Sequence, residues 1–143
     1  MLVSQILKSK GDSVFTISPH ETIGSASSLL HSRKVGALVV QNEAEKVVGI
    51  ISERDVVRAV AETGAAALQQ PVSRSMSSEV IFAEPTESVD ELLTRMTDRR
   101  IRHLPVCRDG RLIGIVSIGD LVKAKIAEAE HEAQTLKNYI AAG

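Results

Sequence analysis

Short apolar runs alternate with polar turns along the chain, in an order that occurs twice. Each copy begins with a short run of strand character, Val14–Ile17 or Val80–Ala83, that soon meets a proline. Apolar residues then recur every three or four positions, which predicts a helix with one buried face. Two more apolar runs follow around a polar turn and predict a hairpin. A second helix should begin at Ser52 or Ser117, so the predicted unit is β-α-β-β-α.

The two copies can be aligned over most of their length. Pro19 pairs with Pro85, and "GIISERDVV" pairs with "GIVSIGDLV" after one extra residue in the hairpin turn of the first copy. Thr22 and Ser88 are the expected N-caps of the first helices, and Ser88 has the capping-box spacing to Glu91. The expected buried faces of those helices are Ile23, Ala26 and Leu30, and Val89, Leu92 and Met96.

The alignment gives the domain organisation. We expect the first repeat at 1–64, a linker at 65–71, the second repeat at 72–125 and a helical extension at 126–143. Apolar residues of the final helix are spaced alternately by four and three, which is typical of a coiled-coil seam. These residues are Val122, Ile126, Ala129, Ala133, Leu136 and Ile140. The helix could instead pack on its own module.

Composition argues against binding to nucleic acid or to a membrane. Aromatic residues make up only 2% of the chain, whereas stacking on single-stranded nucleic acid needs aromatic platforms. The formal net charge of −1 provides no basic field for nucleic acid or an anionic membrane. The sequence shows no signal peptide, no membrane span and no zinc-binding pattern, and the single cysteine, Cys107, cannot form an internal disulfide. We therefore expect a cytoplasmic protein without a metal.

The segments "KVGALVV…EKVVGIISERDVV" and "RIRHLPVCRDGRLIGIVSIGDLV" resemble the cystathionine-β-synthase (CBS) domain, and the tandem pair resembles a Bateman module. The resemblance extends from Val3 to about Lys125. It implies an α/β (α+β) fold in which two tandem β-α-β-β-α repeats pack about a pseudo-twofold axis and leave two clefts. Many such modules bind AMP, ADP, ATP, NAD(H) or S-adenosylmethionine there. They often form homodimers, and they usually regulate another protein and are not enzymes.

The Ser-x-x-Asp motif has two interpretations. Serine and aspartate at this spacing can simply cap a helix. A duplication of the repeat would copy such a cap, so its presence in both copies does not by itself indicate a ligand site. The resemblance instead implies that the aspartate accepts the hydroxyls of a ribose. A carboxylate suits that task, and the adjoining helix N-terminus favours a phosphate. Both Asp55 and Asp120 are therefore candidate ribose acceptors.

Basic residues beside the motif differ between the copies. "SERD" contains Arg54, whose guanidinium suits a phosphate, whereas "SIGD" has no charge between serine and aspartate. Arg102 and His103 begin a predicted strand, where the resemblance implies phosphate contacts, although a solvated basic turn would look the same. The full candidate set for nucleotide binding is Thr16, Lys34, Val35, Gly36, Ala37, Ser52, Arg54, Asp55, Phe82, Ala83, Arg102, His103, Leu104, Pro105, Ser117 and Asp120.

The sequence thus predicts a regulatory sensor that binds an adenine nucleotide such as AMP, ATP or NAD(H) between its repeats. The alternative is a ligand-free structural or protein-interaction module in which Ser-x-x-Asp only caps helices. No catalytic dyad, triad or phosphate loop is present in the sequence, so we expect neither an enzyme nor a catalytic cofactor. A homodimer and an unidentified regulated protein are the expected partners.

Overall fold

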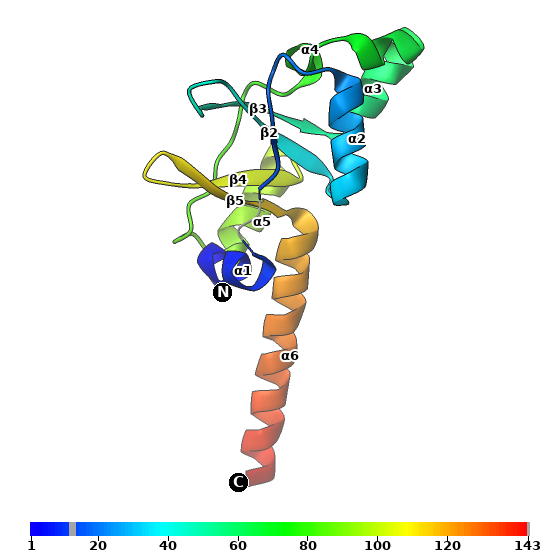
Figure 1. Cartoon of the computed structure of the whole chain (residues 1–143). Helices are drawn as coiled ribbons and strands as arrows, with labels where there is room; N and C mark the ends of the chain where they lie inside the picture. Colours follow the sequence, from blue (N-terminus) through cyan, green and yellow to red (C-terminus); the bar gives the residue numbers. More distant parts are fainter. Residues whose placement is uncertain (12–13, 143) are drawn as a thin grey trace. The chain divides into compact units, whose positions relative to one another are not determined.

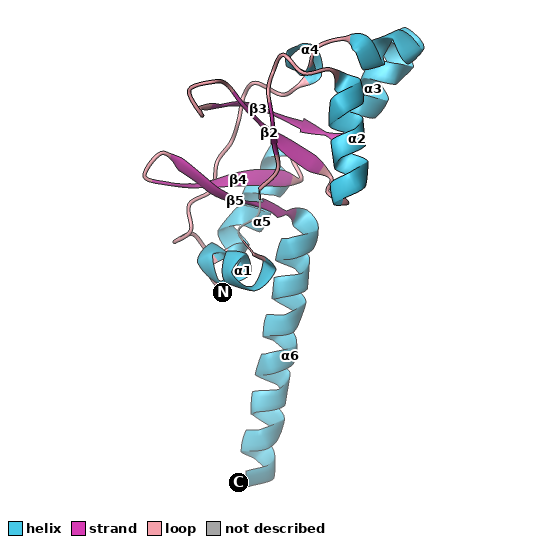
Figure 2. Ribbon diagram, in the orientation of Figure 1, coloured by secondary structure: helices cyan, strands magenta, loops and turns pink. Residues whose placement is uncertain are grey.

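The computed structural model describes residues 1–11 and 14–142, and its Cα positions divide into two compact units. One unit combines Met1–Asp12 with Phe82–Gly143, and the other is Ser13–Ile81. Each unit contains a mixed arrangement of helices and a small sheet (Figures 1 and 2), as the predicted α+β class requires.

The unit Ser13–Ile81 is built on a three-stranded sheet of order β1-β2-β3. β1 pairs in parallel with β2, and β2 pairs antiparallel with β3, so the predicted hairpin is confirmed. The elements of this unit are β1 (Thr16–Ile17), α2 (Ile23–Arg33), β2 (Ala37–Gln41), β3 (Val47–Ser52), α3 (Glu53–Thr63), the 3-10 helix η1 (Gly64–Gln69) and α4 (Val72–Ser75).

The other unit repeats this plan around a single antiparallel hairpin, β4-β5. Leu121 and Ala124 on the first turns of α6 are buried, but most of this long helix is exposed. The elements are α1 (Val3–Lys10), α5 (Val89–Arg99), β4 (His103–Arg108), β5 (Arg111–Ser117) and α6 (Ile118–Ala142).

The strand predicted at Val80–Ala83 is reduced to one parallel bridge, between Ala83 and Val106. In the first repeat, the N–H of Val39 donates to the carbonyl of Phe15 and extends the pairing of β1 with β2. Pro105 occupies the position of Val39 in the second repeat, and proline has no N–H to donate. The prediction of a full strand was wrong because it overlooked this proline.

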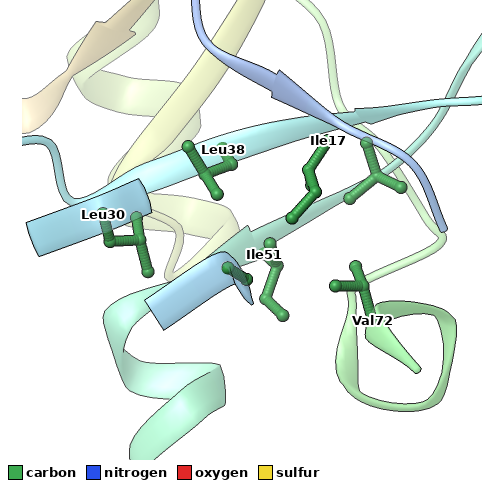
Figure 3. Close-up of a cluster of buried hydrophobic side chains, with 7 residues drawn as sticks. Ile17, Leu30, Leu38, Ile51 and Val72 are labelled. Carbon is green, nitrogen blue, oxygen red and sulfur yellow. The ribbon is translucent and has the colours of Figure 1, made fainter. Parts of the chain in front are cut away.

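Predicted helix starts and buried faces are confirmed. The hydroxyls of Thr22 and Ser88 accept the N–H groups of Ser25 and Glu91, three residues into α2 and α5. The expected faces of both helices are buried. In the unit Ser13–Ile81, aliphatic side chains from α2, the sheet and α4 converge on one cluster (Figure 3): Ile17, Ala26, Leu30, Leu38, Val40, Ile51 and Val72.

The N-terminal helix α1 belongs to the compact unit of the second repeat, whereas α4 belongs to the compact unit of the first repeat. The N–H of Val72 in α4 donates to the carbonyl of Glu21, at 2.7 Å. The N–H of Val3 in α1 makes the equivalent bond to Glu87, at 2.9 Å, and so joins the first helix to the second repeat's unit. Most of the segment expected as a linker, 65–71, forms η1, in which Ala67 is fully buried.

Candidate functional site

The first Ser-x-x-Asp motif forms a reciprocal cap at the start of α3. The hydroxyl of Ser52 accepts the N–H of Asp55, at 3.3 Å. Oδ2 of Asp55 accepts both the N–H and the hydroxyl of Ser52, at 2.8 and 3.0 Å. Oδ1 takes no part in the cap and lies 3.5 Å from Nη1 of Arg58. The predicted cap is thus present, and the second carboxylate oxygen accepts a long hydrogen bond from Arg58.

The second motif forms the same cap at the start of α6 but has an additional partner. The N–H of Asp120 donates to the hydroxyl of Ser117, at 3.1 Å, and Oδ2 of Asp120 accepts the N–H of Ser117, at 2.9 Å. The same Oδ2 lies 2.6 Å from Nζ of Lys10, on α1. Lys10 therefore neutralises the carboxylate of Asp120 at close range, whereas the more exposed Arg58 pairs with that of Asp55 at 3.5 Å.

Lys10 also makes a hydrogen bond that a backbone N–H makes at the equivalent position of the first repeat. There, the strand carbonyl of Ile50 accepts the N–H of Ser77, at 2.9 Å. The equivalent carbonyl, that of Ile115, instead accepts Nζ of Lys10, at 2.8 Å. Lys10 reaches this point because α1 spans eight residues, whereas its equivalent α4 spans only four. The ammonium group thus satisfies a strand edge and a carboxylate together.

Electrostatics at Asp120 follow from these contacts. Burial raises the pKa of its carboxyl, but the hydrogen bonds from Lys10 and Ser117 and the charge of Lys10 together hold that pKa below its ordinary value of 3.8. Asp120 is therefore ionised at neutral pH and compensated by Lys10.

The glycine before each motif admits a close side-chain contact. A Cβ on Gly49 would lie 2.5 Å from the sulfur of Met76 and 3.0 Å from the carbonyl of Ser77. A Cβ on Gly114 would lie 2.5 Å from a methyl of Leu7. These glycines therefore let α4 and α1 pack against the strands that lead into the motifs.

The hairpins bring further predicted residues beside each cap. The N–H of Glu53 donates to the carbonyl of Gly36, at 3.0 Å, and Ala37 lies opposite Ser52 in the β2–β3 register. In the other unit, the N–H of Ile118 donates to the carbonyl of Arg102, at 2.9 Å. His103 lies opposite Ser117 there. Each unit thus assembles its own motif with the strand start that precedes it.

Exposure separates the remaining candidates. The side chains of Arg54, Lys34 and Arg102 are exposed, as phosphate contacts would require. Thr16 and Phe82 are also exposed, and Val35 is half-buried. The side chains of Ala37, Ala83, Leu104 and Pro105 are buried, so in this conformation these four residues would meet a ligand through their backbone.

Sequence reasoning missed two charged residues at the motifs. Arg58 stands three positions after Asp55, and helical spacing alone could have suggested that pair. Lys10 carried no such signal, because it lies far from Asp120 in the sequence.

Burial raises the pKa of the Cys107 thiol, which disfavours the reactive thiolate.

Two features are absent from residues 1–11 and 14–142. No three His, Cys, Asp or Glu side chains gather as metal ligands would in this part of the chain. None of its helices is both long enough and apolar enough to cross a membrane.

Several known proteins are similar to this chain in sequence or in fold. The mitochondrial CBS domain-containing protein CBSX3 of Arabidopsis thaliana is 37% identical over 149 aligned positions, which cover 99% of this chain and 72% of the relative. The crystal structure of the CBS-domain protein ATU1752 from Agrobacterium tumefaciens is 47% identical, with a TM-score of 0.84 over 87% of this chain and 92% of that one.

Two more distant structures contain ligands. PAE2072 from Pyrobaculum aerophilum is complexed with AMP; it is 28% identical, with a TM-score of 0.75 over 84% of this chain and 89% of that one. The CBS domain pair of MJ0100 is complexed with 5-methylthioadenosine and S-adenosyl-L-methionine; it is 27% identical, with a TM-score of 0.80 over 90% and 98%. The CBS domain profile matches residues 3–62 and 72–127. The chain therefore belongs to the CBS domain family and carries two tandem CBS repeats.

Proposed function

We propose that this protein is a regulatory module that binds an adenine nucleotide at its Ser-x-x-Asp motifs. One observation carries the proposal: the cap at Ser52 uses Oδ2 of Asp55, while Oδ1 lies outside the cap and has a long contact, 3.5 Å, with the mostly exposed Arg58. A carboxylate oxygen in this position can accept a hydroxyl of a ribose while the cap holds the side chain in place.

The surroundings of Asp55 suit the rest of a nucleotide. The N-terminus of α3 favours an anion, and Arg54 is an exposed guanidinium one position before Asp55. Lys34 ends α2 with an exposed ammonium, just before the strand start that reaches the motif. We propose that Arg54 and Lys34 contact phosphate and that Asp55 binds the ribose.

The second motif is the weaker site in this proposal. A ribose at Asp120 would have to share the carboxylate with Lys10 or displace its ammonium, which would leave the carbonyl of Ile115 without that donor. We therefore propose that Asp55 binds ligand first. Asp120, with Arg102 nearby, is the second site, because Lys10 holds its carboxylate more closely than Arg58 holds that of Asp55.

The ligands of PAE2072 and MJ0100 support the choice of ligand class, because all of them contain adenosine. For this chain we propose AMP, ATP or NAD(H), and S-adenosylmethionine belongs in the same test. Ligand can regulate a partner only if the two conformations of the module bind it unequally. The module itself is proposed not to be an enzyme.

Thermal unfolding with AMP, ATP, NADH and S-adenosylmethionine tests the proposal. A ligand at 100 times its Kd adds about 2.7 kcal/mol to the free energy of unfolding, which raises Tm by roughly 5–10 °C for a chain of this size. Asp55→Asn should remove about half of the shift or more, as a loss of tenfold or more in affinity requires. Glu62→Gln is the matched control, because it changes an exposed carboxyl further along α3 and leaves the cap intact, and it should retain most of the shift. If none of the four raises Tm, the ligand-free interaction module is favoured.

The cytoplasmic location expected from the sequence also stays a prediction, since the name of the Arabidopsis relative places that protein in mitochondria. Cell fractionation with an antibody against the chain tests it. Recovery in an organelle fraction would contradict it.

A further inference from the structure

The C-terminal part of α6 presents apolar side chains that no other element of its unit covers. Ile126, Leu136 and Ile140 are 54%, 60% and 68% exposed. The buried apolar contacts of α6 come from Leu121 and Ala124, and its ion pairs with the rest of the unit involve Lys125 and Glu128. The described residues after Glu128 are all exposed. In Figure 2 the rest of the helix extends past α1 and α5, the neighbouring helices of its own unit.

The exposed apolar side chains form one narrow seam, separate from the packed face. At about 100° per residue, the six seam positions lie within about 80° of one another around the helix. Leu121 and Ala124 face a direction roughly 100–160° away from the middle of that seam. A second helix could therefore cover the seam without displacing α1 or α5. The seam residues are Val122, Ile126, Ala129, Ala133, Leu136 and Ile140.

Charges beside the seam are complementary to a parallel copy of the same helix. With Ile126, Ala133 and Ile140 at the a positions, Lys125 and Glu132 occupy g positions. In a parallel pair, each g residue faces the e residue five positions further along the partner helix. Glu132 would then face Lys137 of the second copy. Lys125, whose Nζ is 2.9 Å from the exposed Asp90, would gain a second acidic neighbour in Glu130.

The reversed arrangement places like charges together. If Leu136 of one chain faced Ile126 of an antiparallel copy, the e positions would face each other, and so would the g positions. Glu130 would then lie opposite Glu130, and Glu132 opposite Glu132. Lysine and glutamate are mixed beside the seam, which makes an anionic membrane a poorer partner than a second copy, because helices that bind such surfaces carry mainly Lys and Arg there.

We infer that the exposed seam of α6 binds the same seam of a second copy of this chain, as a parallel two-stranded coiled coil. Residues 122–142 provide three heptads, about 30 Å of helix. Alanine at two of the six seam positions allows the helices to approach closely. The inference does not depend on nucleotide binding, because the seam is distinct from both Ser-x-x-Asp motifs.

Sedimentation or light scattering of the whole chain tests the association. We expect a mass twice the 15.4 kDa of one chain. The double variant Ile126→Asp/Leu136→Asp should return to the mass of one chain. The matched control, Ala127→Asp/Asn138→Asp, changes exposed positions away from the seam and should stay dimeric. A wild-type monomer, or a dimer unaffected by Ile126→Asp/Leu136→Asp, would overturn the inference.

Disulfide trapping tests the orientation. In a Cys107→Ser background, Leu136→Cys should cross-link to itself under mild oxidation, because equal positions meet in a parallel pair. A dimer in which Leu136→Cys cross-links only when mixed with Ile126→Cys would show an antiparallel pair and contradict the parallel assignment. Adenine-nucleotide binding measured on the monomeric double variant distinguishes loss of the dimer from loss of the proposed function.

Discussion

Replacing Lys10 with methionine should destabilise the second repeat's unit. Methionine keeps the apolar stem but removes the ammonium group, which bonds both Oδ2 of Asp120 and the carbonyl of Ile115. The Lys10 and Asp120 side chains are 34% and 25% exposed, so solvent screens part of their attraction. Fully exposed pairs contribute about 0–1 kcal/mol, and hydrogen bonds to shielded charged groups about 1.5–3 kcal/mol. This pair lies between those cases.

We therefore expect Lys10→Met to lower the free energy of unfolding by about 1–1.5 kcal/mol at pH 7. That loss corresponds to a Tm lower by roughly 3–5 °C. Urea unfolding followed by circular dichroism measures the change. Lys8→Met is the matched control, because Lys8 is an exposed lysine on the same helix, and its replacement should change stability by less than about 0.5 kcal/mol.

The pH dependence of this penalty tests its cause. The folded chain lowers the pKa of Asp120, so the unfolded chain takes up the proton first as the pH falls. The stabilisation is present at neutral pH and is lost as the pH falls below 3.8 toward the folded-state pKa. The cost of Lys10→Met should shrink over that range and also in an Asp120→Asn background at pH 7. An equal cost in both backgrounds would refute the ion pair as its source.

Three further substitutions have outcomes that the packing predicts. Gly49→Ala should lower the free energy of unfolding, measured by urea titration, by about 1–3 kcal/mol. This loss should exceed that of Gly114→Ala, because a Cβ at position 49 meets a backbone carbonyl, and the reverse order would contradict the contact geometry. Arg95→Met should lower the free energy of unfolding at neutral pH by about 1–2 kcal/mol, because Arg95 forms a bidentate pair with Glu87. If Arg95→Met cost as much in a Glu87→Gln background, the pair would not be the source of the loss. Pro105→Val should add a slowly exchanging amide at position 105, and fast hydrogen exchange there would show that the missing strand has another cause.

Much of each repeat could be predicted because the signals are local. The caps at Ser52 and Ser117 and both hairpins follow from residues only a few positions apart. The reduced strand was also readable, since Pro105 cannot donate a hydrogen bond, but the alignment of the repeats concealed the difference. Aligning the two repeats therefore predicted the elements that they share better than the features in which they differ.

The contact of Lys10 with Asp120 depends on information that the sequence pattern does not contain. It requires α1 to join the second repeat's unit and to continue past the length of α4. Neither event has a local signature, because apolar helix faces of similar spacing can pack on either repeat. The electrostatic difference between the two motifs thus emerged only from the structure, although "SERD" and "SIGD" already pointed to unequal sites.

Calorimetric titration of AMP into the whole chain and into Asp55→Asn most directly tests whether the first motif binds a ribose. We predict saturable binding to the wild-type chain and at least a tenfold loss of affinity, about 1.4 kcal/mol, in Asp55→Asn. Parallel titrations with ATP, NADH and S-adenosylmethionine cover the other adenosine-containing ligands. Equal affinity of the wild-type chain and Asp55→Asn for the ligand that binds, or no binding of any of the four, would contradict the proposed role of Asp55.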